Sequence, residues 1–251
     1  YLDPDGSFPN HIPNPENEAA MQSILDAVQE SKADLGIIFD TDVDRAGAVL
    51  SDGTELNRNR IIAMMAAILL REHPGTTIVT DSITSTGLAA FIRKHGGVHH
   101  RFKRGYRNVI NESMRLNREG HDSQLAMETS GHGALKENYF LDDGAYLVTR
   151  LLIELARAKK EGYTLESLIA DLAEPAESKE FRMNILVPDF KAYGQKIIDE
   201  LNVYAASQPG WSVAPDNFEG VRVNLDKAHG DGWFLLRLSL HDPLIPLNIE
   251  S

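Results

Sequence analysis

Predicted strands and helices alternate along the first two thirds of the chain, and this alternation restricts the fold more than any other feature of the sequence. A helix with apolar residues at helical spacing is expected over residues 18–31, and the apolar run from Leu35 to Phe39 has the right length for a buried strand. The alternation continues to residue 160. It is typical of an α/β layer with a largely parallel sheet, in which ligands gather at the carboxyl ends of the strands.

The other elements of this α/β part are short strands and helices of ordinary length. Asn57 is expected to cap a helix that runs to about Arg71. The buried face of this helix is predicted to be an apolar stripe of Ile61, Ile62, Met65 and Leu69. Further strands are expected at residues 47–50, 77–80, 99–102 and 124–127, and further helices at residues 86–95, 106–117, 142–160 and 165–172.

The pattern changes after residue 172. Residues 173–178 (Ala-Glu-Pro-Ala-Glu-Ser) are predicted to be a linker. A strand at residues 181–186 and a helix at 190–206 then precede several apolar strands, which indicates an α+β domain. These strands are expected at residues 211–214, 221–225, 233–239 and 245–249. A length of 251 residues is enough for two domains, or for three small ones.

Composition excludes several classes of function. The chain has no cysteine, which rules out disulfides, zinc–thiolate sites and thiol catalysis and fits a cytoplasmic protein. A formal net charge of −12 argues against a nucleic-acid partner. No apolar run is long enough to cross a membrane, so we expect no membrane partner. The chain starts at Tyr1 with neither Met nor a signal peptide, and we expect it to be part of a longer protein.

The strand at residues 35–39 is followed by the alternating Asp40, Asp42 and Asp44, and then by Arg45. Three carboxylates so close together repel one another unless a cation lies among them. In a straight strand, side chains two residues apart stand roughly 7 Å from each other, so the chain must curl to bring all three to one ion. Oxygen-only ligands favour Mg²⁺ over Zn²⁺. The adjoining guanidinium suggests an anion such as phosphate, shared between the metal and Arg45.

Other kinds of loop also begin with alternating aspartates. An EF-hand needs Gly at the sixth position of its loop and Glu at the twelfth, where this chain has Arg45 and Ser51, so that interpretation fails. A phosphatase with an aspartate nucleophile usually carries a small hydroxyl residue soon after the aspartates, where this chain has Asp44 and Arg45. A plain acidic turn at the end of a strand remains open.

Two further polar clusters follow or end predicted strands. Residues 101–107 (Arg-Phe-Lys-Arg-Gly-Tyr-Arg) concentrate positive charge, and Gly105 would open a helix whose free N–H groups, together with Lys103, face an anion. Residues 127–132 (Met-Glu-Thr-Ser-Gly-His) offer acceptors, donors and a group that titrates near neutrality, a mixture that suits the hydroxyls of a sugar. Solvated surface and an ordinary loop are the respective alternatives.

A fourth cluster lies at residues 237–243 (Arg-Leu-Ser-Leu-His-Asp-Pro), at the end of an apolar strand. Arg237 and Ser239 alternate onto one face of that strand, where they would hold a phosphate. A solvated strand face is the alternative for this pair.

Taken in this order, the four clusters resemble the α-D-phosphohexomutase family, most closely its bacterial phosphomannomutase/phosphoglucomutase members. The family's metal loop usually reads Asp-Gly-Asp-x-Asp-Arg, and residues 40–45 read Asp-Thr-Asp-Val-Asp-Arg. Its sugar loop usually reads Glu-Met-Ser-Gly-His, and residues 128–132 read Glu-Thr-Ser-Gly-His. Residues 103–106 fall where the family has Lys-x-Gly-His, and residues 218–223 and 237–243 are similar to its closing phosphate-binding domain.

The resemblance implies consecutive α/β/α three-layer domains with mixed sheets, followed by a smaller α+β domain with a mainly antiparallel four-stranded sheet. Residues 1–54 would be the end of a second domain with the metal loop, residues 55–175 a third domain with the sugar loop, and residues 176–251 a fourth, phosphate-binding domain. The catalytic-serine domain would lie outside this chain. The resemblance therefore implies a C-terminal fragment that is inactive without the missing N-terminal domains of the same protein.

The resemblance also implies a reaction. Family members transfer a phosphoryl group from a phosphoserine to a hexose phosphate, and the resulting bisphosphate reorients before it returns the other phosphoryl group. Asp40, Asp42 and Asp44 would hold Mg²⁺, the implied cofactor, which polarises the moving group. Arg45 would neutralise charge as it develops.

The substrate would be held by residues of the other three clusters. His132 would be a general acid or base near the reacting hydroxyl, and Lys103 a second one or an electrostatic helper; both would also contact the substrate. The other implied substrate-binding residues are Glu128 and Ser130 for the sugar hydroxyls, and Arg237 and Ser239 for the phosphate that is not transferred.

The sequence departs from the family pattern at several places. It has no segment like Thr-Ala-Ser-His-Asn-Pro, in which the family's serine lies. Thr41 replaces the usual Gly of the metal loop, and Tyr106 stands where His is common. Leu240 and His241 replace small polar residues of the phosphate loop.

The leading hypothesis is a phosphohexomutase fragment whose parent interconverts the 1- and 6-phosphates of glucose or mannose. One alternative is phosphoglucosamine mutase, whose sugar loop more often carries Gln where this chain has Thr129. A second is a Mg²⁺-dependent phosphatase with Asp40 as the nucleophile. A third is a non-catalytic module that binds sugar phosphates.

Overall fold

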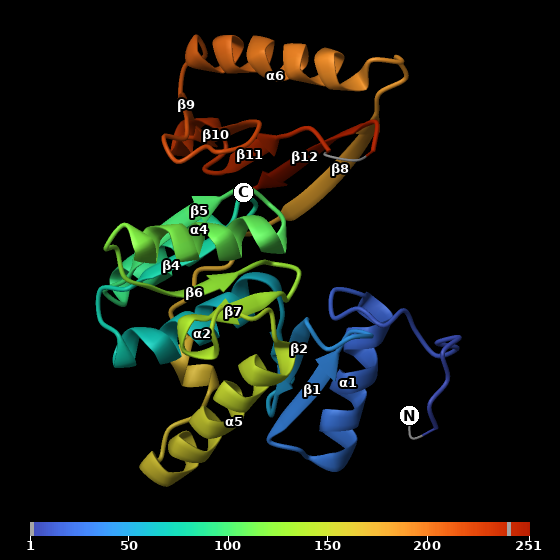
Figure 1. Ribbon diagram of the computed structural model, residues 1–251, viewed down its shortest axis with the longest axis vertical. Coiled ribbons are helices and arrows are strands. Elements are labelled where there is room, and N and C mark those ends of the chain that lie inside the picture. The colour runs from blue at the N-terminus through green and yellow to red at the C-terminus, as the bar shows by residue number, and fades with distance from the viewer. Residues whose placement is uncertain (1–2, 240–241) are drawn as a thin grey trace. The chain divides into compact units, whose positions relative to one another are not determined.

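The computed structural model describes residues 3–239 and 242–251, and most of its helices and strands are labelled in Figure 1. The chain divides into two compact units, each with its own core. The first unit comprises Tyr1–His100 and Gly105–Ala173, and the second comprises Arg101–Arg104 and Glu174–Ser251. No helix among the described residues is both long enough and apolar enough to cross a lipid bilayer.

A three-stranded antiparallel sheet opens the first unit. Its elements are α1 (Glu18–Ser31), β1 (Leu35–Phe39), β2 (Ala46–Leu50) and β3 (Glu55–Leu56), with the strands in the order β1-β2-β3. The register places Phe39 opposite Ala46, so the segment with the alternating aspartates is the loop of a hairpin. A connection this short requires neighbouring strands to run antiparallel. The prediction of largely parallel strands is therefore wrong for this sheet.

The second sheet, which lies in the first unit apart from Arg101 and Phe102, is mixed, as predicted. Its strands, in order across the sheet, are β5 (Val98–Phe102), β4 (Thr77–Asp81), β6 (Ser123–Met127) and β7 (Gly133–Leu135). Strands β4 and β6 run parallel with Thr80 opposite Met127, so their carboxyl ends meet at one edge. Strand β7 returns antiparallel to β6, and residues 128–132 form a second short hairpin loop.

Four helices accompany this sheet. They are α2 (Arg58–Glu72), α3 (Thr86–Lys94), α4 (Tyr106–Arg118) and α5 (Gly144–Glu161). Helix α4 packs against β4 and β6, whereas α2 contacts β3, β6, α3 and α5. The caps are local: the Ser85 side chain accepts from the N–H of Leu88 at 2.8 Å at the start of α3, and Asp143 accepts from the N–H of Tyr146 at 2.9 Å at the start of α5.

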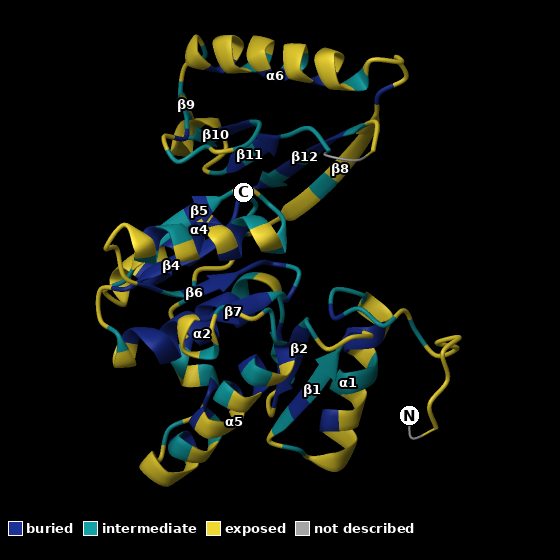
Figure 2. Ribbon diagram, viewed as in Figure 1, coloured by how far each residue is buried: buried dark blue, intermediate teal, exposed yellow. Residues whose placement is uncertain are grey.

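Helix α2 is buried on every side. The sequence predicts one apolar stripe, but every residue from Ile61 to Leu70 is buried, including Ile68 and Met64 outside the stripe. This follows from the position of α2 among two sheets and two helices, since a helix that is apolar all round belongs in a core. By contrast, α5 carries exposed residues along its outer side (Figure 2).

Two predicted features of the first unit are wrong. Residues 165–172 do not form an α-helix; only Glu166–Leu168 make a 3-10 turn, where the Ser167 hydroxyl donates to the carbonyl of Thr164 at 2.6 Å. Asn57 does stand at the N-cap of α2, but its side chain donates to Glu55 Oε2 at 3.2 Å instead of capping the helix. The short strands β3 and β7 and a 3-10 turn at Lys136–Asn138 are not predicted.

The second unit is an antiparallel sheet with one long helix beside it. Its strands, in order, are β8 (Ser178–Asn184), β12 (Leu244–Glu250), β11 (Trp233–Leu236), β10 (Val221–Leu225) and β9 (Trp211–Val213). Helix α6 (Phe190–Ala206) contacts β9 and β10, and a 3-10 turn lies at Lys227–His229. The α+β pattern is confirmed. The sheet has five strands where the resemblance implies four, because β8 pairs with β12 along its whole length.

We expect Ile68→Ala to destabilise the protein as much as Ile62→Ala, by roughly 2–5 kcal/mol each, because both side chains lie in the same core. Leu152→Ala, at an exposed position of α5, is the control and should cost well under about 1 kcal/mol. Urea unfolding followed by circular dichroism measures all three. A loss at Ile68 no larger than at Leu152 would contradict the burial of α2 on that side.

Candidate functional site

The aspartate loop, residues 40–45, joins β1 to β2 and brings its three carboxylates together. One oxygen of each of Asp40, Asp42 and Asp44 lies within 4.8 Å of the other two. The loop bends at Val43, whose φ of 65° lies in the left-handed region. The chain thus curls as the sequence predicts, and the all-oxygen set suits a small hard cation such as Mg²⁺.

Arg45 is bound to the first aspartate of this loop. Its Nε donates to Asp40 Oδ2 at 2.7 Å, and its backbone N–H donates to Asp40 Oδ1 at 3.1 Å. Burial by itself would raise the pKa of Asp40, but the hydrogen bonds from Arg45 help to outweigh burial and hold this pKa below its usual value. Asp40 is therefore ionised near neutrality, with both oxygens engaged by one residue.

The pKa of Asp44 is shifted in the opposite direction to that of Asp40. Burial raises the pKa of Asp44 to about 6, the neighbouring Asp40 carboxylate raises it as well, and the charge of His132 opposes the rise. Asp44 Oδ1 is buried and accepts no hydrogen bond from the described residues. A buried carboxylate oxygen without a donor is costly, and a bound cation would satisfy it. The donor set and this oxygen both fit a divalent metal ion.

The polar loop, residues 128–132, joins β6 to β7 and is a tight turn closed by its own backbone. The N–H of Glu128 donates to the carbonyl of His132 at 2.9 Å, and the N–H of Gly131 donates to the carbonyl of Glu128 at 3.1 Å. Gly131 has a φ of 99°, and a Cβ there would lie 2.9 Å from the carbonyl oxygen of Ala46. Glycine is required because the backbone is left-handed and approaches β2 so closely.

The aspartate loop and the polar loop pair with each other. Arg45 and His132 form an antiparallel backbone bridge, and the N–H of Ala46 donates to the carbonyl of Gly131 at 3.3 Å. The side chains meet as well, since His132 Nδ1 lies 3.6 Å from Asp44 Oδ2. The predicted residues that the structure brings together are Asp40, Asp42, Asp44, Arg45, Glu128, Ser130 and His132.

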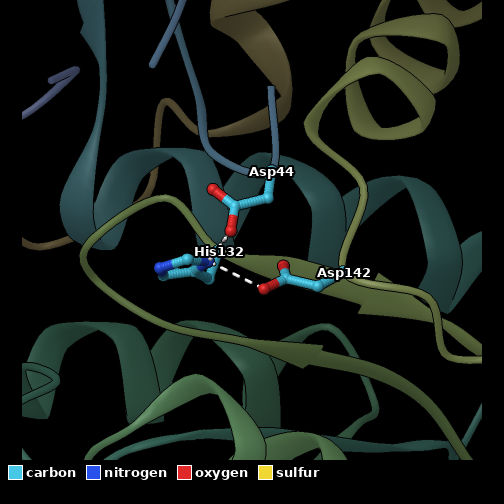
Figure 3. A group of neighbouring side chains, drawn as sticks. All are labelled: Asp44, His132 and Asp142. Carbon is cyan, nitrogen blue, oxygen red and sulfur yellow. Dashed lines mark hydrogen bonds and ion pairs between the residues drawn. The ribbon is translucent and has the colours of Figure 1, made fainter. Parts of the chain in front are cut away.

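His132 is held by a carboxylate and by an aromatic ring. Its Nδ1 lies 2.8 Å from Asp142 Oδ2 (Figure 3), and Nδ1 carries the proton of this bond because an ionised carboxylate only accepts. The Tyr106 ring stacks on the imidazole with the centroids 4.9 Å apart and the planes 21° from parallel. Burial lowers the pKa of His132, but the Asp142 hydrogen bond and the surrounding carboxylates outweigh burial and raise it.

Asp142 is a site residue that is not among those predicted from the sequence. Its Oδ2 accepts a hydrogen bond from His132 Nδ1, and its Oδ1 accepts one from the N–H of Gly133 at 3.1 Å. The available signal is the pair Asp142-Asp143 at the start of a predicted helix, which by itself indicates only helix capping. Asp143 does cap α5, and the fold places Asp142 beside the polar loop.

Glu128 is the anion that faces the start of α4. The N–H of Gly105, the N-cap residue, donates to Glu128 Oε1 at 2.5 Å, and the Ser130 hydroxyl donates to Glu128 Oε2 at 3.3 Å. The sequence predicts that the Gly105 N–H faces an anion, and the structure supplies one from within the protein. A carboxylate at a helix N-terminus is also favoured by the helix dipole. Glu128 therefore has a fixed orientation.

Thr129 stands where the family usually has Met, and its hydrogen bonds to a buried carboxylate account for the threonine. Asp81, at the end of β4, accepts from the backbone N–H of Thr129 at 3.2 Å and from its hydroxyl at 2.8 Å. The neighbouring parallel strands β4 and β6 end at the same edge, which is why these two residues meet. No local sequence pattern marks Asp81 as a site residue.

The three other predicted site residues belong to the second unit. Lys103 Nζ lies 6.0 Å from the centroid of the Phe102 ring. Arg237 and Ser239 lie just beyond β11, and their N–H groups donate to the carbonyls of Pro246 at 3.1 Å and of Leu244 at 3.0 Å. Leu240 and His241, which depart from the family pattern, lie outside the described residues.

The first unit is thus an α/β structure in which an acidic hairpin loop lies against a histidine-bearing loop. Family models named "Phosphoglucomutase/phosphomannomutase, alpha/beta/alpha domain II" and "domain III" match residues 1–53 and 57–175, together well over half of the chain. The chain belongs to the phosphoglucomutase/phosphomannomutase family.

Three similar proteins show how far the likeness extends in sequence or in fold. A phosphoglucomutase of Neisseria meningitidis is 31% identical over 252 residues, which are 100% of this chain and 51% of the relative. A family protein of Burkholderia thailandensis, solved by crystallography, has a TM-score of 0.79 at 31% identity. The alignment covers 99% of this chain and 49% of the Burkholderia chain. The Aspergillus fumigatus N-acetylphosphoglucosamine mutase, solved in complex with GlcNAc-6P and magnesium, shares the fold with a TM-score of 0.52. It is 14% identical, and the aligned part covers 90% of this chain and 52% of the mutase chain. This chain spans about half the length of the curated relatives it matches.

Metal affinity should weaken as the pH falls through about 6, because a proton on Asp44 then competes with the cation. The free energy of unfolding of the metal-free protein changes with pH in the opposite direction. The pKa of Asp44 is higher in the folded protein than its unfolded value of about 3.9, so the stability gained from protonated Asp44 is lost as the pH rises through about 6. Calorimetric Mg²⁺ titrations between about pH 5 and about pH 7.5 test this. Asp44→Asn should bind weakly throughout, and a constant affinity of the unaltered protein would contradict the assignment.

Proposed function

We propose that this chain is part of a phosphohexomutase, which interconverts hexose 1-phosphates and hexose 6-phosphates. The observation that carries the proposal is the backbone pairing of Arg45 with His132, which sets an acidic loop beside a histidine within one compact unit. Membership of the family supplies the reaction class. The proposed activity is that of a protein with the relatives' full length, about twice the length of this chain.

The three aspartates would hold Mg²⁺, with Arg45 beside them. A bound ion supplies positive charge next to the phosphoryl group that is transferred. Arg45, through its two hydrogen bonds to Asp40, orients the first carboxylate and adds a second positive charge at the same place. The Aspergillus fumigatus N-acetylphosphoglucosamine mutase, which shares this fold, is described in complex with magnesium and a sugar phosphate.

His132 would move the proton of the reacting hexose hydroxyl. Asp142 engages Nδ1, so Nε2 is the nitrogen that takes the proton when the hydroxyl attacks the phosphoryl group, and returns it in the reverse direction. The Asp142 hydrogen bond and the surrounding carboxylates raise the pKa of His132, which favours the protonated imidazole that returns the proton in the reverse direction. Tyr106 and Asp142 limit the rotation of the ring.

Glu128 and Ser130 would bind sugar hydroxyls. Because the N–H of Gly105 fixes Glu128, its carboxylate is oriented before the sugar arrives. In the second unit, Arg237 and Ser239 would bind the phosphate that is not transferred, and Lys103 would add positive charge. The proposed divisions are residues 1–54 with the aspartate loop, residues 55–175 with the polar loop, and residues 176–251 with Arg237 and Ser239.

The alternative functions have less support. A phosphatase would need Asp40 as a nucleophile, and both Asp40 oxygens accept hydrogen bonds from Arg45. A phosphoglucosamine mutase would use the same loops, so the preferred sugar phosphate is determined by assay. The absence of cysteine supports a reducing compartment, and we include the cytoplasm in the proposal.

Asp42→Ala should remove measurable Mg²⁺ or Mn²⁺ binding, because it deletes one of three carboxylates that converge on the ion. Isothermal calorimetry measures the affinity. Asp199→Ala, which removes an exposed aspartate of α6 in the second unit, is the matched control and should leave binding unchanged. An affinity of the Asp42→Ala protein equal to that of the control would exclude the proposed metal site.

A protein that contains this chain and has the relatives' full length should interconvert the phosphates of glucose or mannose with Mg²⁺. His132→Ala in that protein should lower kcat by about 10²–10⁴-fold, because the proton transfer loses its carrier. Glucose, mannose and glucosamine phosphates are assayed side by side. Failure with all three would leave a non-catalytic binding module as the better explanation, and steady phosphate release abolished by Asp40→Asn would favour the phosphatase.

A further inference from the structure

The start of helix α5 touches the aspartate loop backbone to backbone. The N–H of Gly144, the first residue of α5, donates to the carbonyl oxygen of Val43 at 3.0 Å. The first N–H groups of a helix have no partner inside the helix, so this donor is available for an outside acceptor. Val43 lies between Asp42 and Asp44, and its carbonyl is therefore part of the chain that carries the carboxylates.

Val43 holds a backbone conformation that its side chain disfavours. Its φ of 65° is left-handed, and a β-branched residue is an outlier there. Such a residue persists where the surroundings fix it, and these residues cluster at functional sites. The Gly144 hydrogen bond is a contact that fixes it, because it engages the carbonyl of the strained residue itself.

The contact also requires residue 144 to be glycine. A Cβ at this position would lie 2.8 Å from the Val43 carbonyl oxygen, 2.9 Å from the Arg45 carbonyl carbon and 3.0 Å from the Arg45 carbonyl oxygen. All three are backbone atoms, which cannot turn aside as the end of a side chain can. A larger residue would push the aspartate loop and α5 apart.

Helix α5 is a firm support for this contact. Asp143 caps it through the N–H of Tyr146, and Leu147 and Leu151 are fully buried in the main core of the first unit. The helix therefore cannot move away without loss of core packing. If a larger residue at position 144 pushed the two apart, the aspartate loop would move and the helix would stay in place.

We propose that Gly144 is a positioning residue for the aspartate loop: by contacting the backbone at Val43 and Arg45 it sets the distance between the carboxylates. The inference rests on the proposed metal site, since it concerns how that site is held. Gly144 itself touches neither the ion nor the substrate. Its effect is on the affinity of the loop for a divalent cation.

The first test is Mg²⁺ and Mn²⁺ titration of Gly144→Ala by calorimetry. We expect the affinity to fall about ten- to hundredfold, the range typical of residues that orient metal ligands. Alanine is a better helix former than glycine, so helix propensity alone would stabilise α5. The urea midpoint without metal serves as the second readout, and a retained midpoint with a lost affinity separates positioning from general destabilisation.

Ala145→Gly is the matched control. It changes the same turn of α5 by the reverse substitution, at an exposed position. We expect it to lower stability slightly through helix propensity and to leave metal affinity unchanged. A similar loss of affinity in both variants would overturn the proposal, because the effect would then belong to the helix and not to the contact.

The second test uses the unaltered protein and does not depend on whether a variant folds. Hydrogen exchange followed by NMR should show the Gly144 N–H protected and the Ala145 N–H in the same helical turn much less so, since Gly144 donates to Val43. Mg²⁺ should increase the protection of Gly144. If the Gly144 and Ala145 N–H groups exchanged equally fast and without protection, with or without Mg²⁺, the proposal would be overturned.

The outcomes separate this inference from the proposed function. If the unaltered protein binds no divalent cation, the metal site fails and the inference fails with it. If the unaltered protein binds the cation and Gly144→Ala binds it equally well, only the positioning role is overturned. Loss of affinity in Gly144→Ala, with Ala145→Gly unaffected and the Gly144 N–H protected, supports both.

Discussion

The crowding of negative charge in the aspartate loop is the constraint on which the rest of the site depends. Carboxylates this close interact strongly where water is partly excluded. The protein offsets the repulsion through the Arg45 hydrogen bonds to Asp40, the raised pKa of Asp44 and the nearby His132. Arg45 also forms the backbone bridge to His132, so the groups that balance the charge tie the aspartate loop to the polar loop.

Short hairpin loops make this arrangement possible. The aspartate loop closes β1 on β2 and the polar loop closes β6 on β7, and each leaves side chains at the end of a strand. Two glycines allow other backbone to approach the aspartate hairpin, Gly131 at Ala46 and Gly144 at Val43. Backbone contacts hold their partners more closely than flexible side chains do, because a backbone atom has no rotamer to change.

Local patterns predict the elements that local forces form. The apolar run of β1 and the helical spacing of apolar residues in α1 give bounds that the structure reproduces, because both signals reside within the segment itself. The sequence also predicts α2, but not that all its faces are buried, since its neighbours β3, β6, α3 and α5 come from four separate segments. It predicts a helix at residues 165–172, where the hydroxyl of Ser167 bonds to the chain locally and only a 3-10 turn forms.

The sequence by itself determined which residues make up the two loops and that the aspartates must curl, because repulsion and residue spacing act within a few residues of each other. Tertiary structure alone decided that Asp142 engages His132, that the Gly105 N–H meets Glu128 and not an outside anion, and that Asp81 holds Thr129. These partners come from separate segments. Their hydrogen bonds depend on strand order and register, which local spacing does not encode.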